Sequence, residues 1–173
     1  MSSKETIHLC DRKLESPVFG YACLSAGEEC FGADVGDFSI IINKYGILEY
    51  RKYLFAEILN KETFYELPEK AINEIIEILE KHKSEIASFT DTDNGSCDGA
   101  FNYFLFGDKW VESLNIDETD DIDEVKERNP RYYDEYLENM IMENQILSVF
   151  DEINTVLKKY GVDLSLNSVK FNL

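Results

Sequence analysis

The stretch Phe101-Asn-Tyr-Phe-Leu-Phe106-Gly107-Asp108-Lys109-Trp-Val-Glu-Ser-Leu114 decides the fold of this chain. Two runs of aromatic and aliphatic residues flank Gly107-Asp108, and a two-residue link that begins with glycine selects a primed turn between antiparallel strands. Because side chains alternate along a strand, the odd-numbered positions lie on one face and Phe104 and Phe106 on the other. Both faces are apolar, so we expect a central hairpin that is covered on both sides.

The residues before this hairpin also predict strands. Residues 18–24 are apolar and small, residues 37–43 contain three consecutive isoleucines, and residues 47–55 are again aromatic and aliphatic. The link Lys44-Tyr45-Gly46 between the last two runs predicts a second antiparallel hairpin. Residues 25–36, which are rich in glycine and acids, are expected to form a loop.

The first predicted helix covers residues 67–87. Pro68 suits its first turn, where the missing N–H has no partner to lose. Apolar residues recur at helical spacing and predict one buried stripe. The residues of this stripe are Ile72, Ile75, Ile76, Leu79 and Ile86.

The second predicted helix covers residues 130–160 and ends at Gly161 after two lysines. Its expected apolar stripe is Tyr133, Tyr136, Met140, Leu147, Phe150, Ile153 and Leu157. An unbroken helix of that length would be about 46 Å long, whereas a domain of this size has a radius of gyration of about 16 Å. We therefore expect a break near Glu143-Asn144, and a last short strand or hairpin in residues 162–166 and 169–173.

The order of strands, helix, hairpin, helix and final strand favours an α+β fold. We expect an antiparallel or mixed sheet with two main helices packed on one face. The chain has 173 residues, which predicts a single domain over residues 1–173.

The charge of the chain is strongly negative, with 35 Asp and Glu against 17 Lys and Arg and a formal net charge of −18. Such a field repels nucleic acid and anionic membranes and attracts basic surfaces. Hydrophobic residues make up 44% of the chain, which is too much for a disordered acidic tail. The N-terminus lacks the pattern of a signal peptide, and no apolar run approaches the roughly 18 residues of a spanning helix. We therefore expect a cytoplasmic protein.

The acidic residues concentrate in two segments. Residues 117–124 hold six acids among eight residues, and the loop 90–99 holds three more. The spacing of that loop is similar to a calcium-binding loop, but its glycine falls at the fifth position instead of the sixth and no Glu falls at the twelfth. We therefore expect a solvated loop and no metal site.

Features that would indicate an enzyme are weak. His8 and His82 could serve as general bases, but neither is flanked by a nucleophile motif. The cysteines are irregularly spaced and are expected to be free thiols in a reducing compartment: Cys10, Cys23, Cys30 and Cys97. Only four arginines are present, which is little for bidentate phosphate recognition. We expect a protein that is not an enzyme and has no cofactor.

The chain resembles the immunity proteins of bacterial polymorphic-toxin and contact-dependent inhibition systems. The resemblance is one of size, strong acidity, α+β layout and missing catalytic motifs, with a hairpin preceded by Asn94-Gly95-Ser96-Cys97-Asp98-Gly99. It implies tight one-to-one binding of a cognate toxin domain, often by blocking the active site of that domain.

We therefore expect an acidic binding protein that neutralises a basic toxin domain, for example a nuclease. Carboxylates would steer the encounter, and aromatic residues would supply desolvated anchors. The expected contact residues are Asp117, Glu118, Asp120, Asp121, Asp123, Glu124, Asp91, Asp93, Asp98, Tyr132 and Tyr133. Two alternatives remain open: a nucleic-acid mimic that inhibits a DNA-binding enzyme, and a hydrolase with an unrecognised site.

Overall fold

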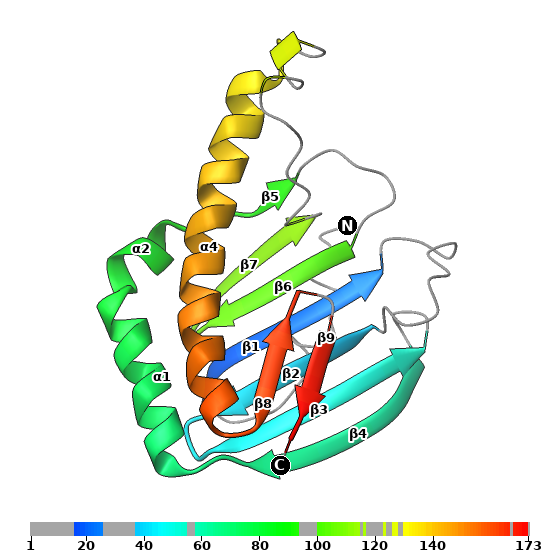
Figure 1. The fold of residues 1–173 in the computed structure, drawn as a ribbon, viewed down its shortest axis with the longest axis vertical. Helices are drawn as coiled ribbons and strands as arrows, with labels where there is room; N and C mark the ends of the chain where they lie inside the picture. Colours follow the sequence, from blue (N-terminus) through cyan, green and yellow to red (C-terminus); the bar gives the residue numbers. More distant parts are fainter. Residues whose placement is uncertain are drawn as a thin grey trace.

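The computed structural model describes residues 16–25, 37–54, 58–93, 100–114, 116, 123, 126–127, 130–166 and 168–172. A seven-stranded sheet forms one layer, and helices α1 and α4 lie on one of its faces together with a two-stranded sheet (Figure 1). The predicted α+β class, with two main helices on one face of a mixed sheet, is confirmed.

The strands are β1 (Pro17–Ser25), β2 (Phe38–Asn43), β3 (Ile47–Leu54), β4 (Ile58–Glu66), β5 (Thr92–Asp93), β6 (Ala100–Phe106), β7 (Lys109–Leu114), β8 (Val162–Ser165) and β9 (Ser168–Phe171). The helices are α1 (Glu69–Lys81), α2 (Lys83–Ser88) and α4 (Tyr133–Lys159). The large sheet has the order β4-β3-β2-β1-β6-β7-β5, and β8 pairs with β9.

Both predicted hairpins are confirmed. β2 pairs with β3 around Gly46, and β6 pairs with β7 around Gly107, both antiparallel. Gly46 has φ 86° and Gly107 has φ 64°, which is the backbone region that favours glycine. At Gly46 a Cβ would also collide with the carbonyl oxygen of Leu67, whose N–H donates to Gly46 O at 2.8 Å.

The hairpin β6–β7 is buried on the face that carries the helices, whereas the expected cover on its other face is only partial, because Tyr103 is buried there but Phe101, Leu105 and Trp110 are half-buried. On the face that carries the helices, the ring of Phe104 lies 5.5 Å from that of Phe150 in α4, and Tyr21 lies 5.0 Å from Phe150. On the opposite face a second apolar cluster forms around Tyr103 and Ile41. β6 lies beside the central strand β1, and this position explains why alternation of polar and apolar residues is absent from it.

The first predicted helix is divided. α1 ends at Lys81, α2 begins at Lys83, and His82 between them has φ −98° and ψ 12°. Ile72, Ile75 and Ile86 are buried as expected, whereas Ile76 is exposed. Apolar spacing could not reveal the break, because the stripe continues through it.

The predicted break in the second helix is wrong, because α4 is continuous over 27 residues, about 40 Å. The expectation assumed that the helix must fit within the diameter of the domain. Instead its N-terminal half extends beyond the sheet (Figure 1). Burial within α4 begins only at Glu143, so Tyr133, Tyr136 and Met140 of the expected stripe are not fully buried.

The end of α4 matches expectation. Gly161 has φ 85°, and its N–H donates to the carbonyl oxygen of Lys158 at 3.2 Å. The predicted final hairpin is β8–β9, and Asn154 holds β8 against α4 through two hydrogen bonds with the backbone of Leu164. None of the helices in the described ranges is long and apolar enough to cross a membrane.

Candidate partner-binding surface

Five of the expected contact residues lie in the described part of the chain: Asp91, Asp93, Asp123, Tyr132 and Tyr133. The other six fall outside it: Asp98, Asp117, Glu118, Asp120, Asp121 and Glu124. The described five come from two segments separated by about thirty residues of sequence, and the fold places Asp91 and Asp93 beside α4, which begins directly after Tyr132.

The segment with Asp91 and Asp93 lies beside α4. Asn139 Nδ2 on α4 donates to the carbonyl oxygen of Asp93 at 2.9 Å. The carboxylate of Asp91 accepts from Glu112 N at 2.9 Å, which ties the segment to β7. Asp91 therefore has a structural contact, and both aspartates lie exposed next to the N-terminal half of α4.

A buried polar cluster marks the point where α4 leaves the sheet. Glu143 Oε1 accepts from Thr92 Oγ1 at 2.9 Å and from Ser113 Oγ at 3.2 Å. Thr92 and Ser113 also lie 2.6 Å apart, oxygen to oxygen. This cluster connects α4 to β5 and β7, so the residues of α4 before Glu143 extend from a fixed base.

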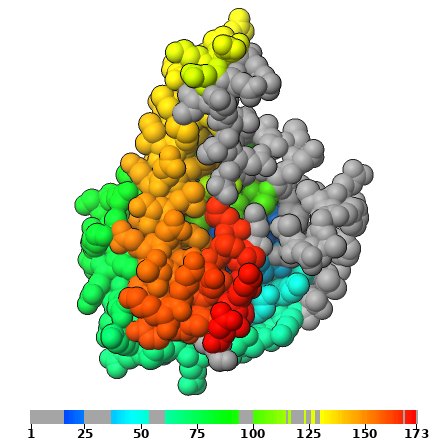
Figure 2. Space-filling model, in the orientation of Figure 1, coloured from blue at the N-terminus to red at the C-terminus, as the bar shows by residue number. Residues whose placement is uncertain are grey.

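The residues of α4 before that base, 133–142, are named the projecting half (yellow in Figure 2). Tyr132, directly before it, is 63% exposed, and Ile141 is 50% exposed. Tyr133 is half-buried, and Lys126 Nζ lies 5.1 Å from the centroid of its ring. Tyr132 is therefore the more accessible of the two expected anchors.

Sequence reasoning did not select three exposed acids of the projecting half, Asp134, Glu135 and Glu138. Asp134, Glu138 and Ile141 follow one another at spacings of four and three residues, so they share one face of the helix. That spacing is visible in the sequence. It went unused because a broken helix with a buried stripe was expected here.

The other end of α4 has a different charge pattern. Lys81 Nζ lies 2.8 Å from Glu152 Oε2, Lys159 Nζ lies 2.8 Å from Glu74 Oε2, and Lys158 pairs with Asp163. The hydrogen bond from Lys81 is the main reason that the pKa of Glu152 lies below its ordinary value. Glu152 on α4, Glu74 on α1 and Asp163 on β8 are thus each paired with a lysine near this end of the helix.

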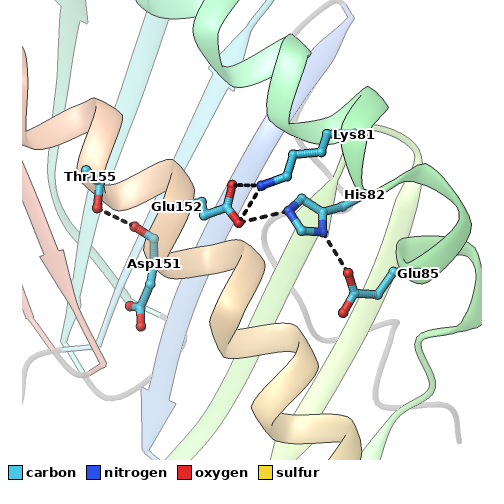
Figure 3. Close-up of polar contacts among 6 residues, drawn as sticks. All are labelled: Lys81, His82, Glu85, Asp151, Glu152 and Thr155. Carbon is cyan, nitrogen blue, oxygen red and sulfur yellow. Dashed lines mark hydrogen bonds and ion pairs between the residues drawn. The ribbon is translucent and has the colours of Figure 1, made fainter.

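His82 belongs to this matched end. Its Nδ1 lies 2.7 Å from Glu85 Oε2, and its Nε2 lies 2.9 Å from Glu152 Oε1 (Figure 3). The ring thus contacts one carboxylate of α2 and one of α4. The side chain therefore links the α1–α2 corner to α4, and this geometry favours a structural contact over a general base.

Cys23 is the one expected thiol within the described residues, and it is buried in β1. Burial, with a smaller effect from Asp37, raises the pKa of Cys23 to about 12. A thiol in this state is not a nucleophile at neutral pH. Cys10, Cys30 and Cys97 lie outside the described residues, as does His8.

Among the residues that the structure describes, no group of three His, Cys, Asp or Glu side chains is arranged to hold a metal ion. No protein-family model matches the chain, and no curated protein matches its sequence. The function proposed below is therefore inferred from the exposed side chains of the projecting half and of the neighbouring Asp91 and Asp93.

Proposed function

We propose that this protein is an acidic binding protein that neutralises a basic cognate toxin domain, such as a nuclease, by tight one-to-one binding. The proposal depends on one observation above all: the N-terminal end of α4 extends beyond the sheet (Figure 1) and carries exposed acidic and apolar side chains. Ile141 shares its helix face with Asp134 and Glu138, so an exposed apolar side chain lies beside acids there.

The mixture of side chains suits a basic protein surface. Asp134, Glu135 and Glu138 would attract a cationic partner over a distance and raise the association rate. Ile141 on that face, and Tyr132 at the N-terminal end of the helix, would then lose water at the interface and slow dissociation. The two effects together are what rapid and lasting inhibition of a toxin requires.

The base of the projecting half favours tight binding as well. Its ten residues span about 15 Å, and the Glu143 cluster and the buried C-terminal half of α4 hold it in place. A segment that is already helical loses little conformational entropy when it binds. We infer that it enters the basic substrate-binding surface of the toxin, beside the exposed Asp91 and Asp93.

The experiment is to purify the protein with the product of its neighbouring gene and to measure association by stopped flow at several salt concentrations. The triple variant Asp134→Asn, Glu135→Gln, Glu138→Gln is compared with a control that neutralises exposed acids elsewhere: Glu69→Gln, Glu77→Gln and Asp151→Asn. The first variant should slow association at low salt by about tenfold, and the control much less. Absence of any complex, or equal effects of both variants, would count against the proposal.

The same preparation separates this function from nucleic-acid mimicry. A mimic would inhibit unrelated DNA-binding enzymes, because its carboxylates would be arranged like phosphates. The proposed protein should inhibit its one cognate toxin and leave such enzymes active.

A further inference from the structure

A second surface lies at the opposite edge of the large sheet. β4 is the first strand in the sheet order, and within the described part of the chain its backbone pairs with β3 alone. The other edge is the two-residue strand β5, which lies beside α4. β4 is therefore the long edge of the sheet (Figure 1), and a long edge presents backbone donors and acceptors to another chain.

The two faces of this edge differ. On the face that carries the helices, Tyr65 stacks on Phe171 of β9 with 4.4 Å between ring centroids. On the opposite face Glu62, Phe64 and Glu66 follow one another at every second residue. Phe64 is 57% exposed, so β9 closes one face of the edge and the other face is open to solvent.

The open face has an excess of negative charge. The register places Glu62 opposite Arg51 and Phe64 opposite Glu49. Arg51 Nε lies 2.6 Å from a carboxylate oxygen of both Glu49 and Glu62. Glu66, two residues beyond Phe64 on the same face, has Ile47 opposite it. The face around Phe64 therefore carries three carboxylates, those of Glu49, Glu62 and Glu66, against the one guanidinium of Arg51, and its charge balance is negative.

We propose that the edge of β4 binds an extended cationic segment of a partner protein, which adds a strand to the sheet. The backbone of β4 supplies hydrogen bonds, Phe64 contacts an apolar side chain, and basic side chains two residues away on either side meet Glu62 and Glu66. The partner is therefore a chain with alternating basic and apolar residues. This inference is independent of the proposed function, because β4 is one edge of the sheet and the projecting half lies beside β5, the other edge.

A second copy of this chain is a poor occupant of the same edge. The antiparallel register that sets Phe64 opposite its own copy also sets Glu62 opposite Glu66, twice. Like charges directly opposite each other destabilise strand pairing, and the net charge of −18 adds a repulsion between copies. A strand with basic residues at these positions would instead place positive charges opposite Glu62 and Glu66, and the contacts would be attractive.

The probe is the peptide acetyl-Thr-Lys-Thr-Val-Thr-Lys-Thr-amide, in which lysine, valine and lysine share one strand face. It is titrated into the whole protein, with amide chemical shifts and amide hydrogen exchange as readouts. Saturable shifts and slowed exchange should be confined to residues 58–66 and the facing residues of β3. The peptide with Glu in place of both Lys residues is the charge control.

Two variants test the assigned side chains. Glu66→Lys should lower the binding affinity for the peptide about three- to tenfold, and Phe64→Thr should lower it by a similar factor. Tyr45→Thr is the matched control, because Tyr45 is also an exposed aromatic residue (64%) but lies in the β2–β3 turn. It should leave binding unchanged.

Any one of four results would overturn this assignment, and three of them concern the peptide and the variants. They are unchanged exchange of β4 amides at millimolar peptide, equal binding of the Glu-containing peptide, and equal effects of Phe64→Thr and Tyr45→Thr. A concentration-dependent dimer that Phe64→Thr abolishes would also overturn it, since a second copy would then occupy the edge.

Discussion

Ile141 and Ile146 lie on the same helix, and the same truncation to alanine should have very different consequences at the two positions. Ile141 is in the projecting half and 50% exposed, whereas Ile146 is 0% exposed and belongs to the core beneath α4. Ile146→Ala removes buried methyl and methylene groups and leaves a cavity, which costs about 3 to 4 kcal/mol of unfolding free energy. Ile141→Ala should change it by less than about 0.5 kcal/mol, because little apolar area returns to water and alanine favours the helix.

The assay is urea unfolding followed by circular dichroism, with the same m-value required of all three proteins. For a chain of this length, a loss of about 3 kcal/mol corresponds to a fall in Tm of roughly 6–12 °C. Ile141→Ala should stay within about 2 °C of the unchanged protein. Equal losses at the two positions would mean that the projecting half is packed against the body, and the binding surface argued above would then be wrong.

Further outcomes concern the base of the projecting half, acid stability and thiol reactivity. Glu143→Ala removes the acceptor of Thr92 and should cost about 1–3 kcal/mol in urea unfolding, with Glu143→Gln milder; no loss would refute the cluster. The pKa of Glu152 is lowered by Lys81, so its contribution to stability is complete above about pH 5 and falls as pH drops through the lowered pKa. Glu152→Gln should flatten the acid limb of a plot of urea midpoint against pH, and an unchanged limb would contradict this. Cys23 should resist iodoacetamide at pH 7.5 until urea unfolds the protein, as mass spectrometry of the labelled peptide would show; rapid labelling of the folded protein would contradict its burial.

The parts of the fold that depend on short-range chemistry could be predicted from the sequence. Gly107-Asp108 and Gly46 fix the turn geometry within a few residues, so the strands on either side follow from local information. The cap at Gly161 is local in the same way. The remaining strands of the hairpins and the two main helices were predicted from apolar runs and stripes, which fold so that they are buried.

Three features were not predicted from the sequence: β4, β5 and the break between α1 and α2. Each of them depends on contacts with residues that are distant in the sequence. β4 reads Ile58-Leu-Asn-Lys-Glu-Thr-Phe-Tyr-Glu66, and its charged residues hide the alternation because an edge strand meets water. β5 is only two residues long and exists because β7 and α4 hold it. The break at His82 is accompanied by contacts with Glu85 and with Glu152, which lies 70 residues away.

The proposed surface combines residues that the sequence indicated with residues that it did not. Acid content indicated Asp91, Asp93 and Asp123, and aromatic content indicated Tyr132 and Tyr133. The acids of the projecting half were missed, because a size argument implied that α4 must turn back toward the body. Part of a long helix can be buried while its other end extends beyond the sheet, and only the fold could establish this here.

The most direct measurement is the amide hydrogen-exchange footprint of the complex with the cognate toxin domain. If the projecting half is the binding element, slowed exchange on binding should concentrate in residues 132–142 and in the neighbouring Thr92–Asp93 strand. Unchanged exchange across residues 132–142 in a saturated complex, with protection elsewhere on the molecule, would contradict the role assigned to this end of α4.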